Sequence, residues 1–114
     1  MRPGLRDAVI ERDARYLWGI ARSPLRFEIW ARHQGVICVV PALEPENRRP
    51  CAGKQEVDHV KDLARLSKKA PDDPYHLVAM CQAHNTWYPP SRALRQAERA
   101  YLAKWRALDE GVFV

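Results

Sequence analysis

The chain has few of the residues that build membrane spans, leader peptides or disulfide frameworks. No apolar run in its 114 residues approaches the roughly 20 residues of a membrane helix. Residues 1–7 contain charged side chains and a proline and lack an apolar core, so we expect no signal peptide. Three cysteines are few for a disulfide framework and favour metal ligation or simple burial. We therefore expect a cytoplasmic protein without a membrane partner.

Positive charge is in modest excess. The chain has 19 Lys and Arg residues against 14 Asp and Glu residues, which gives a formal net charge of +5. A basic surface favours polyanions such as nucleic acids, although charge alone is equally compatible with a merely solvated surface.

The length fits one domain over residues 1–114, which we divide into residues 1–34, 35–90 and 91–114. Apolar spacing predicts helices over residues 5–22 and 91–108, and Ser23-Pro24 marks the start of another helix that ends near residue 32. The buried face of the last helix is predicted to carry Leu94, Ala97, Tyr101, Trp105 and Leu108. Short apolar runs predict strands, and proline-rich stretches predict loops. The predicted strands are residues 36–40, 56–60 and 77–81, the last of which is alternatively the entry to a helix, and the predicted loops are residues 41–53 and 61–75.

Every cysteine and three of the four histidines lie between residues 38 and 84. Cys81 and His84 form a C-x-x-H pair, a spacing that lets two side chains reach one metal ion from a tight turn. Cys38 and Cys51 are the obvious further ligands and complete a Cys3His zinc site. The alternative is that Cys38 and Cys81 are small buried hydrophobic residues.

Asp58 and His59 form a second candidate site. A carboxylate is a hard ligand for a divalent ion, and an imidazole can act as a base near neutral pH. In isolation, the pair would more often be a surface aspartate beside a core histidine.

Three segments of the chain together resemble the HNH endonuclease family. Residues 26–38 are similar to the helix that leads into the family's first zinc cysteine, residues 56–60 to its V-D-H-I strand, and residues 72–85 to the segment that ends in C-x-x-C-H-N. The segments occur in the family's order, and the similarity covers roughly residues 26–88.

The resemblance implies an α+β fold with a ββα-metal (His-Me finger) core, a structural zinc site and flanking N- and C-terminal helices. It also implies a metal-dependent DNA endonuclease. His59 would be the general base, His76 would occupy the family's central Asn position and orient His59, and Asp58 and Asn85 would bind Mg²⁺, Mn²⁺ or another divalent ion. In this alignment the structural zinc ligands are Cys38, Cys51, Cys81 and His84. A competing alignment makes His84 the catalytic metal ligand and leaves zinc with three cysteines.

DNA contacts are expected mainly at phosphates, from basic loop residues and from the basic face of the last helix. The candidates are Arg48, Arg49, Lys54, Lys61, Lys68, Lys69, Arg92, Arg95 and Arg99. Two alternatives to a nuclease remain. One is a non-catalytic, zinc-stabilised nucleic-acid-binding module. The other is a protein-interaction adaptor that uses exposed Trp87, Tyr88 and Trp105, although for these aromatic residues we expect core packing.

Overall fold

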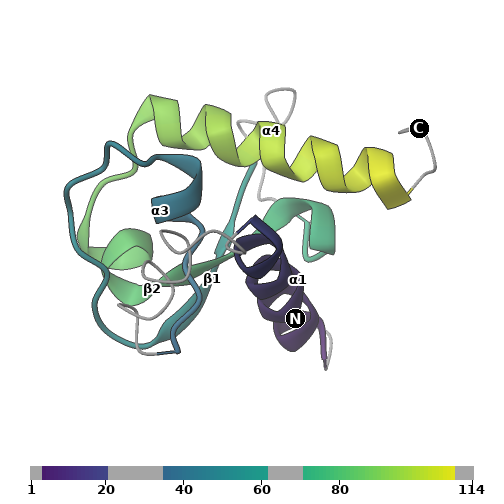
Figure 1. Ribbon diagram of the computed structural model, residues 1–114, viewed down its shortest axis with the longest axis horizontal. Coiled ribbons are helices and arrows are strands. Elements are labelled where there is room, and N and C mark those ends of the chain that lie inside the picture. The colour runs from purple at the N-terminus through teal and green to yellow at the C-terminus, as the bar shows by residue number, and fades with distance from the viewer. Residues whose placement is uncertain (1–3, 21–34, 62–70, 110–114) are drawn as a thin grey trace.

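The computed structural model describes residues 4–20, 35–61 and 71–109 and shows an α+β fold (Figure 1). Two strands and several helices follow one another along the chain. The elements are α1 (Leu5–Ile20), α3 (Val40–Leu43), β1 (Gln55–His59), the 3₁₀ turn η2 (Pro74–His76), β2 (Leu77–Cys81), the single π-helical turn η3 (Ala83–Trp87) and α4 (Arg92–Asp109). The helices predicted at both ends are thus confirmed within the described ranges, and the helix predicted to end near residue 32 lies outside them. None of the described helices is long and apolar enough to cross a bilayer.

β1 and β2 form a two-stranded antiparallel sheet, with Gln55 opposite Cys81 and His59 opposite Leu77. All five residues of β2 are buried, as expected for an apolar strand covered on both faces. Leu5 and Val9 of α1 pack against one end of the sheet. The strands predicted at residues 56–60 and 77–81 are therefore confirmed, the first with its ends shifted by one residue.

The strand predicted over residues 36–40 is wrong. The backbone of Ile37 is hydrogen-bonded to the side chain of Gln55, which accepts from the amide at 2.6 Å and donates to the carbonyl at 2.7 Å. Residue 39 makes one backbone bond to β2, from its amide to the carbonyl of Ala79. Pro41 lacks an N–H and has a φ suited to the first turn of a helix, so the chain turns into α3 instead of continuing as a strand. This short helix also interrupts the loop predicted over residues 41–53.

α4 covers the main core, which contains its residues Leu94, Tyr101 and Leu102 (Figure 1). The buried face predicted for this helix is confirmed at Leu94 and Tyr101 and is wrong at Leu108, which is 44% exposed. Trp105 and Tyr88 pack against the core as expected. Trp87 does not, since it is 52% exposed.

A buried carboxylate joins α1 to β2 and α4. Asp13, which is fully buried, accepts hydrogen bonds from the amide of Ala79 at 2.7 Å and from the hydroxyl of Tyr101. Its charge is paired with Arg12, whose guanidinium also donates to the carbonyls of Pro74 and, at 2.6 Å, Leu77. Burial raises the pKa of Asp13, and the pairing with Arg12 opposes that rise. The three elements are thus held together by polar contacts as well as by apolar packing.

Asp13→Ala should therefore be strongly destabilising. It leaves the Arg12 charge without its partner and removes the acceptor of a buried amide, a change that typically costs about 3–5 kcal/mol. Urea unfolding measures the loss. The control is Glu11→Ala, which breaks only the exposed pair with Arg15 and should cost about 1 kcal/mol or less. Similar losses in the two variants would contradict the role assigned to Asp13.

Candidate metal centre and the end of strand β1

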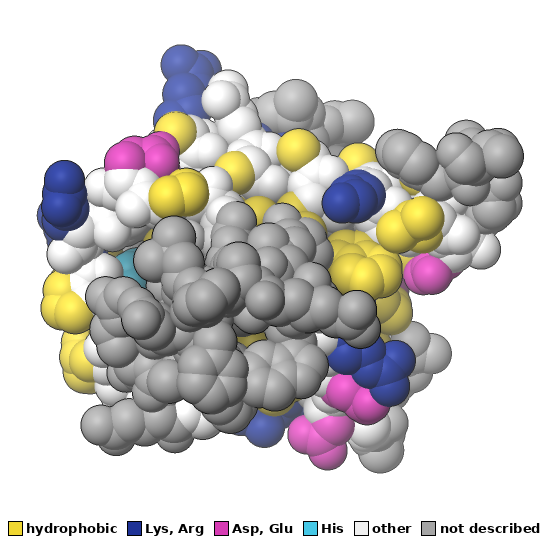
Figure 2. All heavy atoms as spheres, viewed as in Figure 1, with side chains coloured by type: hydrophobic (Ala, Val, Ile, Leu, Met, Phe, Trp, Pro, Cys, Tyr) yellow, Lys and Arg dark blue, Asp and Glu magenta, His cyan; other side chains and the backbone are white. Residues whose placement is uncertain are grey.

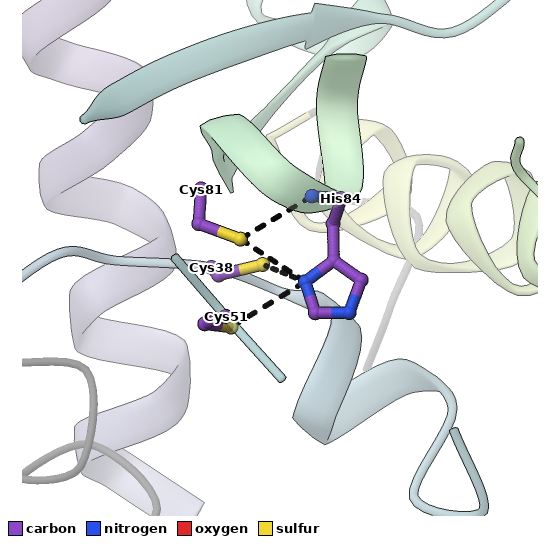
Figure 3. Close-up of side chains that lie close together, drawn as sticks. All are labelled: Cys38, Cys51, Cys81 and His84. Carbon is purple, nitrogen blue, oxygen red and sulfur yellow. Dashed lines mark hydrogen bonds between the residues drawn. The ribbon is translucent and has the colours of Figure 1, made fainter. Parts of the chain in front are cut away.

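Cys38, Cys51, Cys81 and His84 converge on one point beside the core (Figure 3). Their ligand atoms all lie within 4.8 Å of one another. Nδ1 of His84 faces the three sulfurs, at 3.7 Å from Cys38, 3.4 Å from Cys51 and 3.0 Å from Cys81. This grouping can bind a metal ion such as zinc, as the sequence predicted.

The fold brings these ligands together from three segments. Cys81 ends β2 and His84 lies in the η3 turn, where its amide donates to the Cys81 sulfur at 3.4 Å. Cys38 comes from the segment that precedes α3, beside β2. The wide separation of Cys38 and Cys51 in sequence is therefore spanned by α3 and the loop after it.

Backbone pairing holds the Cys51 loop against the β2–η3 junction. The amide of Gln82 donates to the carbonyl of Lys54 at 2.9 Å, and the amide of Ala83 donates to that of Ala52 at 3.0 Å. Gly53 lies between these contacts with a φ of +82°, and a Cβ there would lie 2.5 Å from Oε1 of Gln82. Only glycine fits both the backbone conformation and the close approach.

The geometry and chemistry of the four donors fit a tetrahedral zinc ion. Bond lengths of about 2.3 Å to sulfur and 2.0 Å to nitrogen imply sulfur–nitrogen separations of about 3.5 Å, close to those observed. Thiolate and imidazole are the ligands that structural zinc prefers. Nδ1 of His84 is the ring nitrogen that faces the sulfurs, whereas Nε2 is buried and has no hydrogen-bond partner within the described part of the chain.

The three thiols lie close enough together to shift one another's pKa values. Burial raises the pKa of Cys38 to about 12, and hydrogen bonding with the neighbouring thiols raises that of Cys51. The pKa of Cys81 is lowered because Cys38 and Cys51 donate hydrogen bonds to its sulfur. A bound metal ion would favour deprotonation of all three thiols.

Asp58 points toward α4, where it forms an ion pair with Arg95. Arg95 also contacts Glu98 at 3.1 Å, and Glu98 is fully buried. Burial, followed by the charge of Asp58, raises the pKa of Glu98 to about 8, whereas Arg95 opposes the rise. Two carboxyl groups thus share one guanidinium at the end of β1. Glu98 was missed at the sequence level, although its spacing from Leu94 and Leu102 places it on the apolar face of α4.

His59 and His76 each pair with an aspartate. Nε2 of His59 lies 2.5 Å from Oδ1 of Asp72, and both side chains are partly exposed. Nδ1 of the buried His76 lies 2.7 Å from Oδ1 of Asp73. Neighbouring residues of a strand point to opposite faces, so the His59 side chain is directed away from that of Asp58.

Asn85 contacts the face of β1 opposite to the face that carries His59. Its amide donates to Oε1 of Glu56 at 2.8 Å, and the hydroxyl of Thr86 donates to the same oxygen at 2.8 Å. Glu56 and Asp58 are two positions apart on β1 and therefore share a face. Asn85 is thus directed toward the face of β1 that carries Asp58.

The basic residues proposed for DNA binding fall into three groups. Arg95 is engaged with Asp58, Arg99 donates to the carbonyl of Lys61 at 2.8 Å, and Arg49 lies over the Tyr88 ring. The second group is exposed and consists of Arg48, Lys54, Lys61 and Arg92. Lys68 and Lys69 lie outside the described residues.

No protein-family model, curated protein or solved structure matches this chain. Its function is therefore inferred from its own residues.

We expect the purified protein to contain about one zinc ion per chain, because three cysteines and one histidine whose ligand atoms lie within 4.8 Å of one another supply the four donors of a structural zinc site. His84→Ala and Cys81→Ser should lose the metal, and His59→Ala should keep it because His59 lies outside the cluster. Elemental analysis of protein prepared without chelators measures this. Wild-type protein without bound metal, or variants with unchanged content, would contradict the assignment.

Glu98 should make the stability of the protein depend on pH. A folded-state pKa of about 8, above the ordinary 4.5, means that the folded protein holds a proton that the unfolded chain releases. This stabilising contribution is complete below the unfolded pKa and is lost as pH rises toward about 8. The free energy of unfolding of wild type should therefore fall relative to that of Glu98→Gln between about pH 5 and 8, as followed by urea titrations. A constant difference between the two proteins would show that the pKa is not raised.

Proposed function

We propose that the chain is a metal-dependent DNA endonuclease of the HNH type with a structural zinc ion. The observation that carries the proposal is the order of elements around the metal cluster. Two antiparallel strands are followed at once by the short η3 turn, with Cys81 and His84 at the junction. Asp58 and His59 end the first of these strands. In this proposal β1, β2 and η3 correspond to the ββα-metal core.

His59 is the proposed general base, which removes a proton from the water that attacks the phosphodiester phosphorus. Its partial exposure gives water access, and Asp72 at 2.5 Å fixes the ring and stabilises the imidazolium that forms. The role of His76 is to hold the loop beside His59, with its own ring fixed by Asp73.

Asp58 and Asn85 are the proposed ligands of the catalytic ion, and both are directed toward one face of β1. His59 is directed toward the other face, so in this proposal the scissile phosphate would have to lie across the end of the strand, where β1 stops at His59. Mg²⁺ or Mn²⁺ bound by Asp58 and Asn85 supplies electrostatic stabilisation of the charge that develops on the scissile phosphate. Carboxylate and amide oxygens suit such hard ions. Arg95 must move away from Asp58, or share it, when the ion binds.

The Arg95–Asp58 ion pair favours one alternative function, a zinc-stabilised nucleic-acid-binding module without catalysis. In that case Arg95 permanently neutralises the carboxylate that would otherwise hold the cation. Exposed Arg and Lys side chains would still bind phosphates, and the affinity would fall with added salt.

Nicking of supercoiled plasmid with Mg²⁺ or Mn²⁺ separates the two functions. We expect His59→Ala to lower the nicking rate by about 10²–10⁴-fold, because general-base catalysis contributes about that much. Glu11→Ala on α1 is the matched control and should nick at the wild-type rate. Equal nicking by His59→Ala and wild type would exclude His59 as the base. Salt-sensitive DNA binding without cleavage under any divalent ion would establish the binding module.

A further inference from the structure

Trp87 stands out among the aromatic residues because it is exposed at the end of η3. Its exposure is 52%, and in the described part of the chain only Leu108, on α4, is another exposed large hydrophobic residue. Tyr88, the next residue, is anchored instead. Its ring packs edge-on against His84 of the metal cluster at 5.5 Å, and its amide donates to the carbonyl of Ala83 at 2.9 Å. The backbone that presents Trp87 is therefore fixed to the metal centre.

Acidic and cationic side chains both border the η3 turn, since Glu56 accepts hydrogen bonds from Asn85 and Thr86. The guanidinium of Arg49 lies 4.9 Å from the centre of the Tyr88 ring, beside Trp87 in the chain. Backbone pairing of Lys54 with Gln82 places a second exposed cation near the start of η3. Arg48 is also exposed in this loop. In Figure 2, the left side of the molecule, over the loop and η3 region of Figure 1, carries exposed Lys or Arg and hydrophobic side chains, with an acidic side chain near them.

An exposed indole bordered by cations matches the chemistry of a single-stranded nucleic acid. Aromatic side chains stack on unpaired bases, and nearby Lys and Arg residues follow the phosphates. A duplex hides its base faces within its own stack, so a surface tryptophan meets a free base only where the strand is unpaired. The net positive charge of the whole chain favours a polyanion over a neutral apolar partner.

We propose that Trp87 stacks on an unpaired base of single-stranded DNA, while Arg48, Arg49 and Lys54 contact the adjacent phosphates. We call these four residues the Trp87 platform. This inference rests on the proposed function only in requiring that the chain bind nucleic acid, and it does not depend on cleavage. It assigns single-stranded or locally opened DNA as the preferred ligand class.

The test compares two fluorescent oligonucleotides of about 20 nucleotides, oligothymidylate and an abasic strand with the same number of phosphates. Fluorescence anisotropy measures their affinities without added divalent ion, so that binding is separated from cleavage. Wild type should prefer the strand that has bases. Trp87→Ala should weaken oligothymidylate binding by about 5- to 100-fold and leave abasic binding unchanged, since it removes stacking but no charge.

Two control variants distinguish stacking from a general disturbance. Leu108→Ala removes the other exposed hydrophobic residue and should bind like wild type. Trp87→Phe keeps a ring face and should recover much of the affinity lost in Trp87→Ala. Equal affinity of wild type and Trp87→Ala for oligothymidylate, or absence of binding to either strand, would overturn the inference. Plasmid nicking is scored separately, so a catalytically inactive protein that still shows the Trp87-dependent preference supports the platform while refuting the nuclease.

Discussion

The convergence of Cys38, Cys51, Cys81 and His84 is the constraint on which the rest of the structure depends. A two-stranded sheet is marginally stable by itself, and a chain of 114 residues buries only a moderate share of its surface. The cluster ties the edge segment at Cys38, the loop at Cys51 and the β2–η3 junction to one point. The raised pKa values of Cys38 and Cys51 keep these thiols neutral, whereas a bound cation would favour their thiolates. A metal ion bound at this point would therefore link formation of the site to formation of the fold.

Two buried carboxylates complete the connections between the helices and the sheet. Asp13 links α1 to β2 and α4, and Glu98 shares Arg95 with Asp58 at the end of β1. The second of these has a consequence for function. In the proposed nuclease Asp58 would bind a divalent ion, but its negative charge is already balanced by a side chain from α4. Competition between Arg95 and a cation for Asp58 thus separates the nuclease from the binding module.

The sequence predicted the parts of the molecule that follow from local patterns. Apolar periodicity located α1, α4 and both strands, and ligand counting identified the four-residue cluster. The segment before α3 has the apolar run typical of a strand, whereas the contacts that decide its conformation come from the side chain of Gln55, far along the chain. The partners of Asp58 and His59 were also out of reach, because Arg95 and Asp72 approach them only through tertiary packing. The sequence likewise could not predict that Trp87 is exposed, because its exposure depends on where the η3 turn places this side chain relative to the core.

X-ray absorption spectroscopy at the zinc edge tests most directly the claim that these four residues form a structural zinc centre. The account predicts a four-coordinate ion with three sulfur neighbours at about 2.3 Å and one nitrogen neighbour at about 2.0 Å. A first shell made only of oxygen and nitrogen, or one with fewer than three sulfurs, would contradict it. Such a result would mean that zinc binds elsewhere in the protein and that the three cysteines lie together only because they are buried.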